Sequence, residues 1–200
     1  INSRFAEKIL LSYTETANYL SAAAKSKALV TGNPVRPAFY TASAEKGRRF
    51  ANVNGEKPIL LVIGGSLGAR QINELVEKNL DQLCRHFTVI HQTGIKNVSA
   101  EPCMVSEDVK CNYHPFSFIY AEMPDVIAAA DVVLSRAGAN SLWECSVLGK
   151  PMILIPLSGA GTRGDQEDNA AYFEKRGAAA VLARKNATAE NLLHTLTTFL

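Results

Sequence analysis

The chain has 200 residues, of which 47% are hydrophobic and 20% charged, and its formal net charge is +2. This composition is typical of a globular protein, and so small a net charge does not indicate binding to nucleic acid. No apolar run reaches the roughly 18 residues of a transmembrane helix, and the first residues lack the basic and apolar regions of a signal peptide. This length allows one large domain or one domain plus a piece of another, and the first residues suggest a cut in a longer chain.

Three short elements are predicted near the N-terminus. The apolar run at 7–13 and the run at 28–31 indicate strands, and residues 14–24 between them indicate a helix. The sequence Gly-Asn-Pro at 32–34 then interrupts regular structure, so a domain boundary is expected there. Residues 38–57 are polar and predict a linker with one helix, whose basic side chains form a solvated face.

From residue 58 onward, strands and helices alternate. Pro58–Gly65 is the clearest buried strand, because five large apolar residues lie between proline and glycine. Further strands are predicted at 87–94, 109–116, 131–135, 151–157 and 178–182, and helices at 69–84, 123–130, 139–148, from 165 onward and at 188–200. This α/β alternation predicts a Rossmann-like open parallel sheet with helices on both faces.

The stretch from Asp131 to Asn169 carries the clearest indication of a binding site. Its glycine turn at 136–138 leads into a helix, where free backbone N–H groups and the helix dipole favour an anion. Glu144 lies one helical turn after Ser141 on the same face. A carboxylate beside a phosphate-sized anion site suits the two hydroxyls of a ribose, so the stretch suggests a nucleotide.

Two further candidates fall at the carboxyl ends of predicted strands, where open parallel sheets bind their ligands. The turn Gly64–Gly68 contains Ser66, which could cap the next helix or donate to a phosphate, and tight helix–strand packing explains the turn equally well. Gln166 and Asn169 share the first turn of another helix and suit sugar hydroxyls, although capping at the surface accounts for them slightly better. The turn Gly64–Gly68 does not match the G-x-G-x-x-G fingerprint, and the chain has no P-loop.

Metal chemistry is not indicated. Asp165, Glu167 and Asp168 begin a helix, where the helix dipole favours acidic residues without any metal. The cysteines form no C-x-x-C pair and the histidines lack ligand spacing, so we expect reduced structural thiols; these residues are Cys84, Cys103, Cys111, Cys145, His86, His91, His114 and His194.

Five motifs follow one another along nearly the whole chain. They are TGNPVR (31–36), IGGSLGAR (63–70), SRAGANSLWE (135–144), GKPMILIP (149–156) and RGDQEDNA (163–170). In order and spacing they resemble the MurG family of peptidoglycan glycosyltransferases. Members of that family move N-acetylglucosamine from UDP-N-acetylglucosamine onto lipid I, the lipid-linked muramoyl-pentapeptide, to make lipid II. The resemblance therefore implies an inverting hexosyltransferase of bacterial cell-wall biogenesis.

The resemblance also implies a GT-B architecture, of which this chain is the C-terminal half. Residues 1–30 would be the last strand and helix of the N-terminal acceptor domain, residues 31–57 the hinge and linker, and residues 58–200 the UDP-sugar-binding domain. The family's N-terminal domain binds lipid I and touches the membrane, which implies a peripheral location on the cytoplasmic face of the cell membrane. We expect this chain alone to bind the donor without transferring it, and the catalytic base to lie in the missing domain or at its interface.

Residues that match the family's donor site take their roles from the resemblance. Glu144 would bind the ribose, and the backbone of Ile119, beside Phe118, would contact the uracil edge. Arg36 would reach the donor from the hinge, and Gln166 with Asn169 would hold the sugar. The diphosphate would be bound from two sides, by Ser66 and by the helix start at Ala139, Asn140, Ser141 and Leu142. The resemblance implies no cofactor, no obligatory metal and no nucleic-acid partner.

Two alternatives stay open. One is a different UDP-sugar enzyme of the same fold, such as a glycolipid synthase or a UDP-sugar epimerase. The other is a non-catalytic module that binds a nucleotide sugar or a partner. Two features depart from the family's usual pattern: the sugar motif reads RGDQEDN, and the bulky Trp143 directly precedes Glu144.

Overall fold

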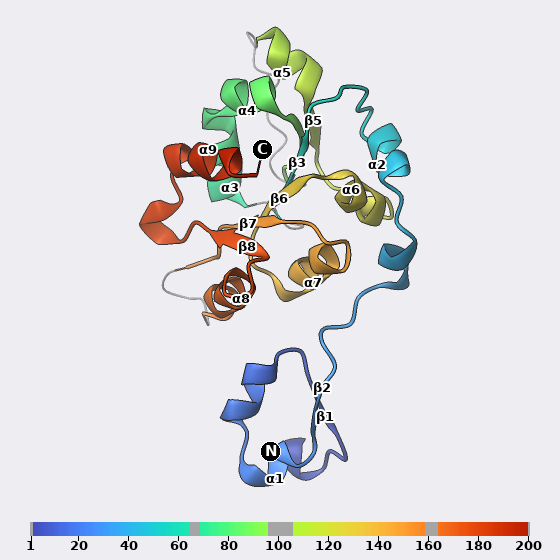
Figure 1. The fold of residues 1–200 in the computed structure, drawn as a ribbon, viewed down its shortest axis with the longest axis vertical. Coiled ribbons are helices and arrows are strands. Elements are labelled where there is room, and N and C mark those ends of the chain that lie inside the picture. Colours follow the sequence, from blue (N-terminus) through green and yellow to red (C-terminus); the bar gives the residue numbers. More distant parts are fainter. Residues whose placement is uncertain (1, 65–68, 96–105, 159–163, 200) are drawn as a thin grey trace. The chain divides into compact units, whose positions relative to one another are not determined.

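A computed structural model describes residues 2–64, 69–95, 106–158 and 164–199 (Figure 1). The chain forms two compact units, Ile1–Val35 and Arg36–Leu200, which we call unit 1 and unit 2. Residues 36–57, placed in a linker by the sequence, make their contacts within unit 2. None of the helices in the described part of the chain is long and apolar enough to cross a membrane.

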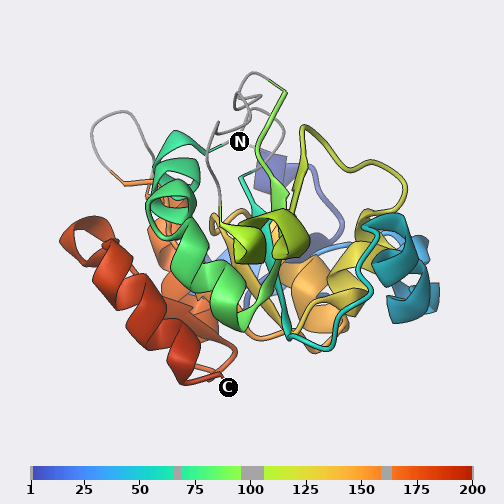
Figure 2. The same cartoon turned by 90° about the horizontal axis from the view of Figure 1, so that it is seen from above.

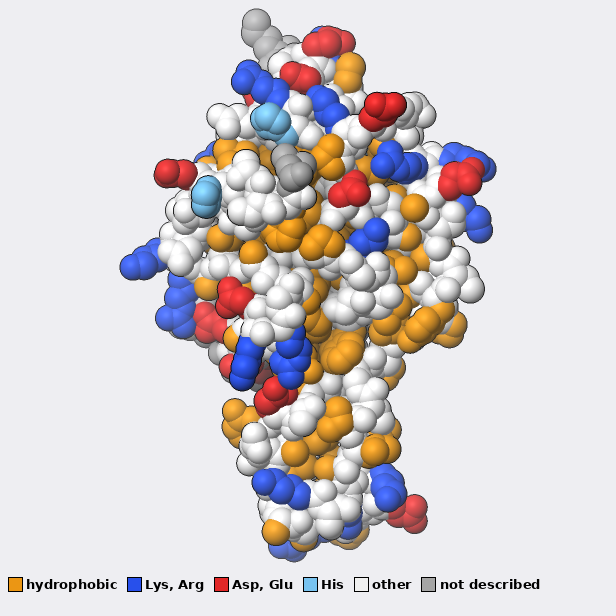
Figure 3. Space-filling view, viewed as in Figure 1, with side chains coloured by type: hydrophobic (Ala, Val, Ile, Leu, Met, Phe, Trp, Pro, Cys, Tyr) orange, Lys and Arg blue, Asp and Glu red, His pale blue; other side chains and the backbone are white. Residues whose placement is uncertain are grey.

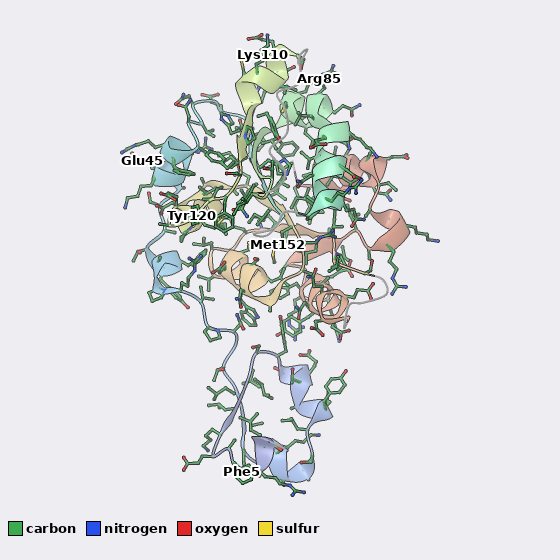
Figure 4. The ribbon with its side chains drawn as sticks, turned by 180° about the vertical axis from the view of Figure 1, so that it is seen from behind. Phe5, Glu45, Arg85, Lys110, Tyr120 and Met152 are labelled. Atoms are coloured by element: carbon green, nitrogen blue, oxygen red, sulfur yellow. The ribbon has the colours of Figure 1, made fainter. Side chains whose placement is uncertain are left out.

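Unit 1 is built on a two-stranded parallel sheet. Its elements are η1 (Asn2–Arg4), β1 (Ile9–Leu11), η2 (Thr14–Tyr19), α1 (Ala22–Lys25) and β2 (Ala28–Val30). Both predicted strands are confirmed, but the single predicted helix at 14–24 is wrong. A 3-10 helix and a separate α-helix take its place, because Ser21 starts a new helix and its hydroxyl accepts a hydrogen bond from the Ala24 N–H at 3.4 Å. Phe5, labelled in Figure 4, is exposed in this unit.

Unit 2 contains a six-stranded sheet in which every pairing is parallel. Its strand order is β5-β4-β3-β6-β7-β8, so the chain runs outward from β3, then returns to β6 and runs outward on the other side. The strands are β3 (Ile59–Ile63), β4 (Thr88–Gln92), β5 (Tyr113–Phe116), β6 (Val132–Ser135), β7 (Met152–Leu154) and β8 (Ala179–Val181). This order is that of a doubly wound Rossmann-type sheet, which confirms the predicted fold. Its switch point lies between β3 and β6.

Helices cover both faces of this sheet. They are η3 (Pro37–Thr41), α2 (Ala44–Phe50), α3 (Arg70–Lys78), α4 (Leu80–His86), α5 (Glu107–Asn112), α6 (Met123–Ala129), α7 (Ala139–Val147), α8 (Asp165–Glu174), η4 (Arg184–Asn186) and α9 (Ala189–Thr197). Figure 2 shows α3, α4 and α9 on one side of the sheet and α6 and α7 on the other. Alternate residues of β3, β4 and β6 face helices α3, α4 and α9 and form a hydrophobic core with them. Met152 on β7, labelled in Figure 4, is fully buried.

Two predicted elements differ from the structure. The predicted helix at 69–84 is two helices, because the side chain of Asn79 donates to the Leu75 carbonyl at 2.7 Å and its backbone leaves the helical region. The predicted strand at 109–116 begins only at Tyr113. A helical segment precedes it, since Ser106 caps the Val109 N–H and Glu107 and Asp108 occupy the first turn.

Helix α2 packs against α6 at a site where only glycine fits. A Cβ on Gly47 would lie 2.0 Å from the backbone oxygen of Asp125. The Asp125 side chain also accepts a hydrogen bond from the Ser43 N–H at 2.7 Å, at the start of α2. The segment that the sequence placed in a linker is therefore held tightly to the second unit's helical layer.

Replacing Gly47 by alanine should destabilise unit 2 by roughly 2 kcal/mol. Overpacking against backbone costs up to about 3 kcal/mol, and the better helix propensity of alanine returns up to about 1 kcal/mol. Urea unfolding of Gly47→Ala and of the control Gly55→Ala, whose added Cβ meets nothing within 4 Å, measures the difference. Equal stability of both variants would show that α2 and α6 can separate without cost.

Candidate functional site

A cavity of about 360 Å³ lies at the carboxyl ends of β3 and β4. Its walls come from the ends of these strands, from the residue before η3, from the loop before α6, and from α6 and α7. The lining residues are Arg36, Ile63, Gln92, Phe118, Ile119, Tyr120, Ala121, Met123, Ile127, Ser141 and Glu144. Arg36, Ile119, Ser141 and Glu144 were all named from the sequence as site residues. The cavity borders the switch point of the sheet, where ligands of such folds bind.

Glu144 is the carboxylate of this cavity, and Arg36 pairs with it. The Arg36 Nε donates to Glu144 Oε1 at 3.1 Å, with side chains 56% and 15% exposed, respectively. The guanidinium also lies over the Phe39 ring, with Cζ 5.0 Å from its centroid, and Phe39 is fully buried. Arg36 is thus anchored beside the predicted ribose carboxylate. The sequence placed both residues at the donor but did not predict that they pair.

Helix α7 holds Glu144 and Ser141 in place and has well-defined ends. At its C-terminus, Gly149 has φ +63°, and the N–H groups of Gly149 and Lys150 donate to the carbonyls of Ser146 and Cys145. At its N-terminus, Gly138 provides no side-chain cap. The first turn, from Ala139 through Asn140 to Ser141, therefore keeps the character of an anion site.

Leu142 makes a different contribution from its predicted one. Its N–H donates within the helix to the Gly138 carbonyl at 3.1 Å, and its side chain is fully buried. The Leu142 side chain packs α7 onto the sheet. Ala139, Asn140 and Ser141 are therefore better placed than Leu142 to contact a diphosphate.

Ile119 and Gln92 form a buried polar contact on the opposite wall of the cavity. The Ile119 N–H donates to Gln92 Oε1 at 2.9 Å, and Gln92 is only 2% exposed. Next to them, the rings of Phe118 and Tyr120 meet edge to face with centroids 4.5 Å apart, and Tyr120 is labelled in Figure 4. Sequence reasoning missed Gln92, although a glutamine that ends a buried strand was a detectable signal.

A second cavity, of about 600 Å³, lies across the end of β3 from the first. It is lined by Gly64, Ala69, Arg70, Gln71, Glu74, Arg136, Leu157 and Gln166. Ile63 lines the first cavity and Gly64 the second, so the two cavities approach each other at the switch point. The region is large enough for a ligand longer than a nucleoside.

Two arginines line this second cavity: Arg70, which pairs with Glu74, and Arg136, which sequence reasoning treated only as part of a turn. The Arg136 Nη1 donates to Gln71 Oε1 and to the Ile155 carbonyl, both at 2.9 Å. Burial lowers the pKa of the Arg136 guanidinium from its ordinary value. A half-buried cation at the end of β6 suits an anionic group in the cavity.

Gln166 lies on the first turn of α8, as predicted, and Asn169 begins the second turn. Gln166 Oε1 accepts from the Leu157 N–H at 2.9 Å, and Asn169 Nδ2 donates to the Ala137 carbonyl at 3.1 Å. These bonds fix both amide groups and leave Gln166 Nε2 as a donor and Asn169 Oδ1 as an acceptor for other groups. Ser66, the remaining predicted phosphate contact, lies outside the described residues.

Acidic and basic side chains are interspersed over the face of unit 2 that Figure 3 shows.

Cys84, Cys111 and Cys145 are free thiols. Where the structure describes the chain, no three residues among His, Cys, Asp and Glu gather closely enough to hold a metal ion.

Comparisons with known proteins show what the chain is similar to. The family model for the glycosyltransferase family 28 C-terminal domain matches residues 59–200. A Treponema denticola protein is 47% identical over 188 residues, which cover 91% of this chain and 48% of that protein. A Geobacillus kaustophilus protein is 43% identical over 188 residues, covering 94% and 50%. Both are named UDP-N-acetylglucosamine–N-acetylmuramyl-(pentapeptide) pyrophosphoryl-undecaprenol N-acetylglucosamine transferase.

A solved structure supports the fold. The crystal structure of Acinetobacter baumannii MurG matches with a TM-score of 0.67 and 24% sequence identity, over 98% of this chain and 53% of that one. The chain thus spans about half the length of the relatives that it matches. These findings confirm the resemblance that the motifs indicated.

Proposed function

The chain belongs to the glycosyltransferase family 28 C-terminal domain family, and we propose that it binds UDP-N-acetylglucosamine as the donor domain of an inverting transferase. The proposed reaction transfers N-acetylglucosamine to lipid I and so produces lipid II for peptidoglycan. The observation that carries this proposal is Glu144, a carboxylate on the wall of a cavity at the switch point of the sheet. It lies one turn after Ser141 on a helix whose start has no side-chain cap.

Each part of the donor has a place in this proposal. Uracil would lie near Ile119 and Phe118, and the ribose hydroxyls would donate to Glu144 in place of Arg36. The diphosphate would meet the N–H groups at the start of α7, and Arg136 would add positive charge nearby. Gln166 would bind the sugar through its Nε2 and Asn169 through its Oδ1. The proposed residues thus follow the donor from base to sugar, across both cavities.

The proposed chemistry depends on electrostatics and not on a metal. When the acceptor hydroxyl displaces UDP, negative charge grows on the diphosphate. Backbone N–H groups and the dipole of α7 are already oriented to stabilise that charge, and their reorganisation costs little. We further propose that the acceptor, the base and the peripheral contact with the cytoplasmic face of the membrane belong to the remainder of the protein.

Calorimetric titration tests the proposal. We expect UDP and UDP-N-acetylglucosamine to bind, UDP-galactose to bind more weakly than UDP-N-acetylglucosamine, and NADH to give no signal. Equal affinity for the two UDP-sugars, or release of a changed free sugar on incubation, would favour another UDP-sugar enzyme such as an epimerase. Absence of UDP binding would contradict the proposal altogether.

A further inference from the structure

Arg184 combines an unusual backbone with a two-pronged ion pair. It begins η4, after β8, with φ +52°, and in the described part of the chain only Asn52 shares such a positive φ outside glycine. Asparagine is enriched in this region of φ, whereas arginine is not. The Arg184 Nε and Nη2 donate to the two carboxylate oxygens of Glu167 at 2.9 and 3.1 Å. Bidentate geometry distinguishes this pair from ordinary surface ion pairs.

Glu167 lies on the same helical turn as the proposed sugar contacts. Gln166 precedes it directly, and Asn169 follows two residues later, at the start of α8. The N-cap of α8 is Gly164, with φ +79°, and it provides no side-chain cap. The start of this helix therefore lacks the local bond that usually fixes a first turn.

Three long-range bonds replace that missing cap. Gln166 is tied to Leu157 after β7, Asn169 is tied to Ala137 before α7, and Glu167 is tied to Arg184 after β8. The first two bonds use groups that would also face the sugar, so a ligand can strain or displace them. The Glu167–Arg184 pair is the tether whose atoms take no part in the proposed recognition.

We propose that Arg184 is a positioning residue for the donor sugar, acting through Glu167 to fix the first turn of α8. In that position Gln166 Nε2 and Asn169 Oδ1 are presented at a constant spacing to the sugar hydroxyls. This inference rests on the proposed function and adds a residue that contacts neither the sugar nor the nucleotide. The effect is confined to the sugar, because the proposed uracil and ribose contacts lie on α7 and on the loop before α6.

The variant Arg184→Gly distinguishes a loss of sugar positioning from a loss of fold stability. Glycine relieves the left-handed backbone and removes the guanidinium, so the fold should lose little or nothing while the tether disappears. Glu167→Gln removes the charge from the other side of the pair and leaves the backbone of residue 184 unchanged. Arg184→Lys keeps a positive charge but cannot form the fork. The matched control is Glu45→Gln, which breaks the exposed pair between Glu45 and Arg49 on α2.

Calorimetry with UDP and with UDP-N-acetylglucosamine, on the whole chain, measures the effect. We expect Arg184→Gly and Glu167→Gln to bind UDP within about twofold of the original chain and UDP-N-acetylglucosamine about tenfold more weakly. Arg184→Lys should fall between, and Glu45→Gln should change neither. Urea unfolding should show that Arg184→Gly remains folded.

Three results would overturn the inference. Unchanged affinity for both ligands in Arg184→Gly and Glu167→Gln would show that the Glu167–Arg184 ion pair is a surface contact without a role in binding. An equal loss for both ligands would show a general role in the fold and not in sugar positioning. Failure of the original chain to bind UDP at all would overturn the proposed function first, and the inference with it.

Discussion

UDP should bind about 100-fold more weakly when Glu144 is replaced by alanine. Two hydrogen bonds from ribose hydroxyls to a carboxylate contribute roughly 1.5–3 kcal/mol each. Against this, the nucleotide must displace Arg36 from Glu144, but Arg36 is more than half exposed and such pairs contribute at most about 1 kcal/mol. A net loss of roughly 3 kcal/mol corresponds to the expected change in the dissociation constant, which calorimetry measures.

A modified ligand shows whether the loss arises at the ribose. The original chain should bind 2′-deoxy-UDP about tenfold more weakly than UDP, because one of the two bonds is missing. Glu144→Ala should no longer distinguish the two ligands. Ser146→Ala is the matched control on the same helix, since the Ser146 hydroxyl donates only to the Leu142 carbonyl. If Glu144→Ala bound UDP as tightly as the original chain, the ribose assignment would be wrong.

The sheet was predictable because its signals are local. The buried run Ile59–Ile63 and the alternation of strands and helices after it leave few possible topologies, and the parallel order follows from them. The helix start at Gly138 and the C-terminal glycine at 149 are likewise set by neighbouring residues. For the same reason Glu144 could be placed near an anion site from spacing alone.

Other features depend on contacts between residues distant in sequence. Arg36 and Glu144 are 108 residues apart, and Gln92 meets the Ile119 backbone across 27 residues, so no window of sequence contains either pair. Asn79 shows a further limit within one helix. The apolar spacing continues through that residue, but the hydrogen bond from its side-chain amide to the Leu75 carbonyl ends the helix.

His91 should make the stability of unit 2 strongly dependent on pH. The imidazole is fully buried in β4, and burial lowers its pKa to about 4 from an ordinary value near 6.5. Between these two pH values the unfolded chain binds a proton that the folded chain does not. Stability is therefore greatest above about pH 6.5 and falls as pH falls, by a total of about 3 kcal/mol near pH 4.

The contacts of His91 fix the tautomer of its neutral imidazole. Asn73 Nδ2 donates to the Thr93 carbonyl at 2.8 Å, which turns Asn73 Oδ1 toward His91 Nε2 at 3.2 Å. That nitrogen must then carry the proton, and Nδ1 accepts from the Tyr113 hydroxyl at 3.0 Å. A second proton on Nδ1 would place a charge in the core, and the lost hydration of that charge is what lowers the pKa of His91.

Urea unfolding at a series of pH values between 8 and 4 measures the effect, with His91→Gln as the comparison. The difference between the two chains isolates His91, because burial also lowers the pKa of His114 and so adds to the pH dependence of the original chain's stability.

We expect His91→Gln to be less stable at pH 8, through its altered core contacts, yet to lose about 3 kcal/mol less on acidification. Parallel curves for the original chain and His91→Gln would show that His91 does not titrate differently in the folded state, and acid sensitivity would then have to arise elsewhere.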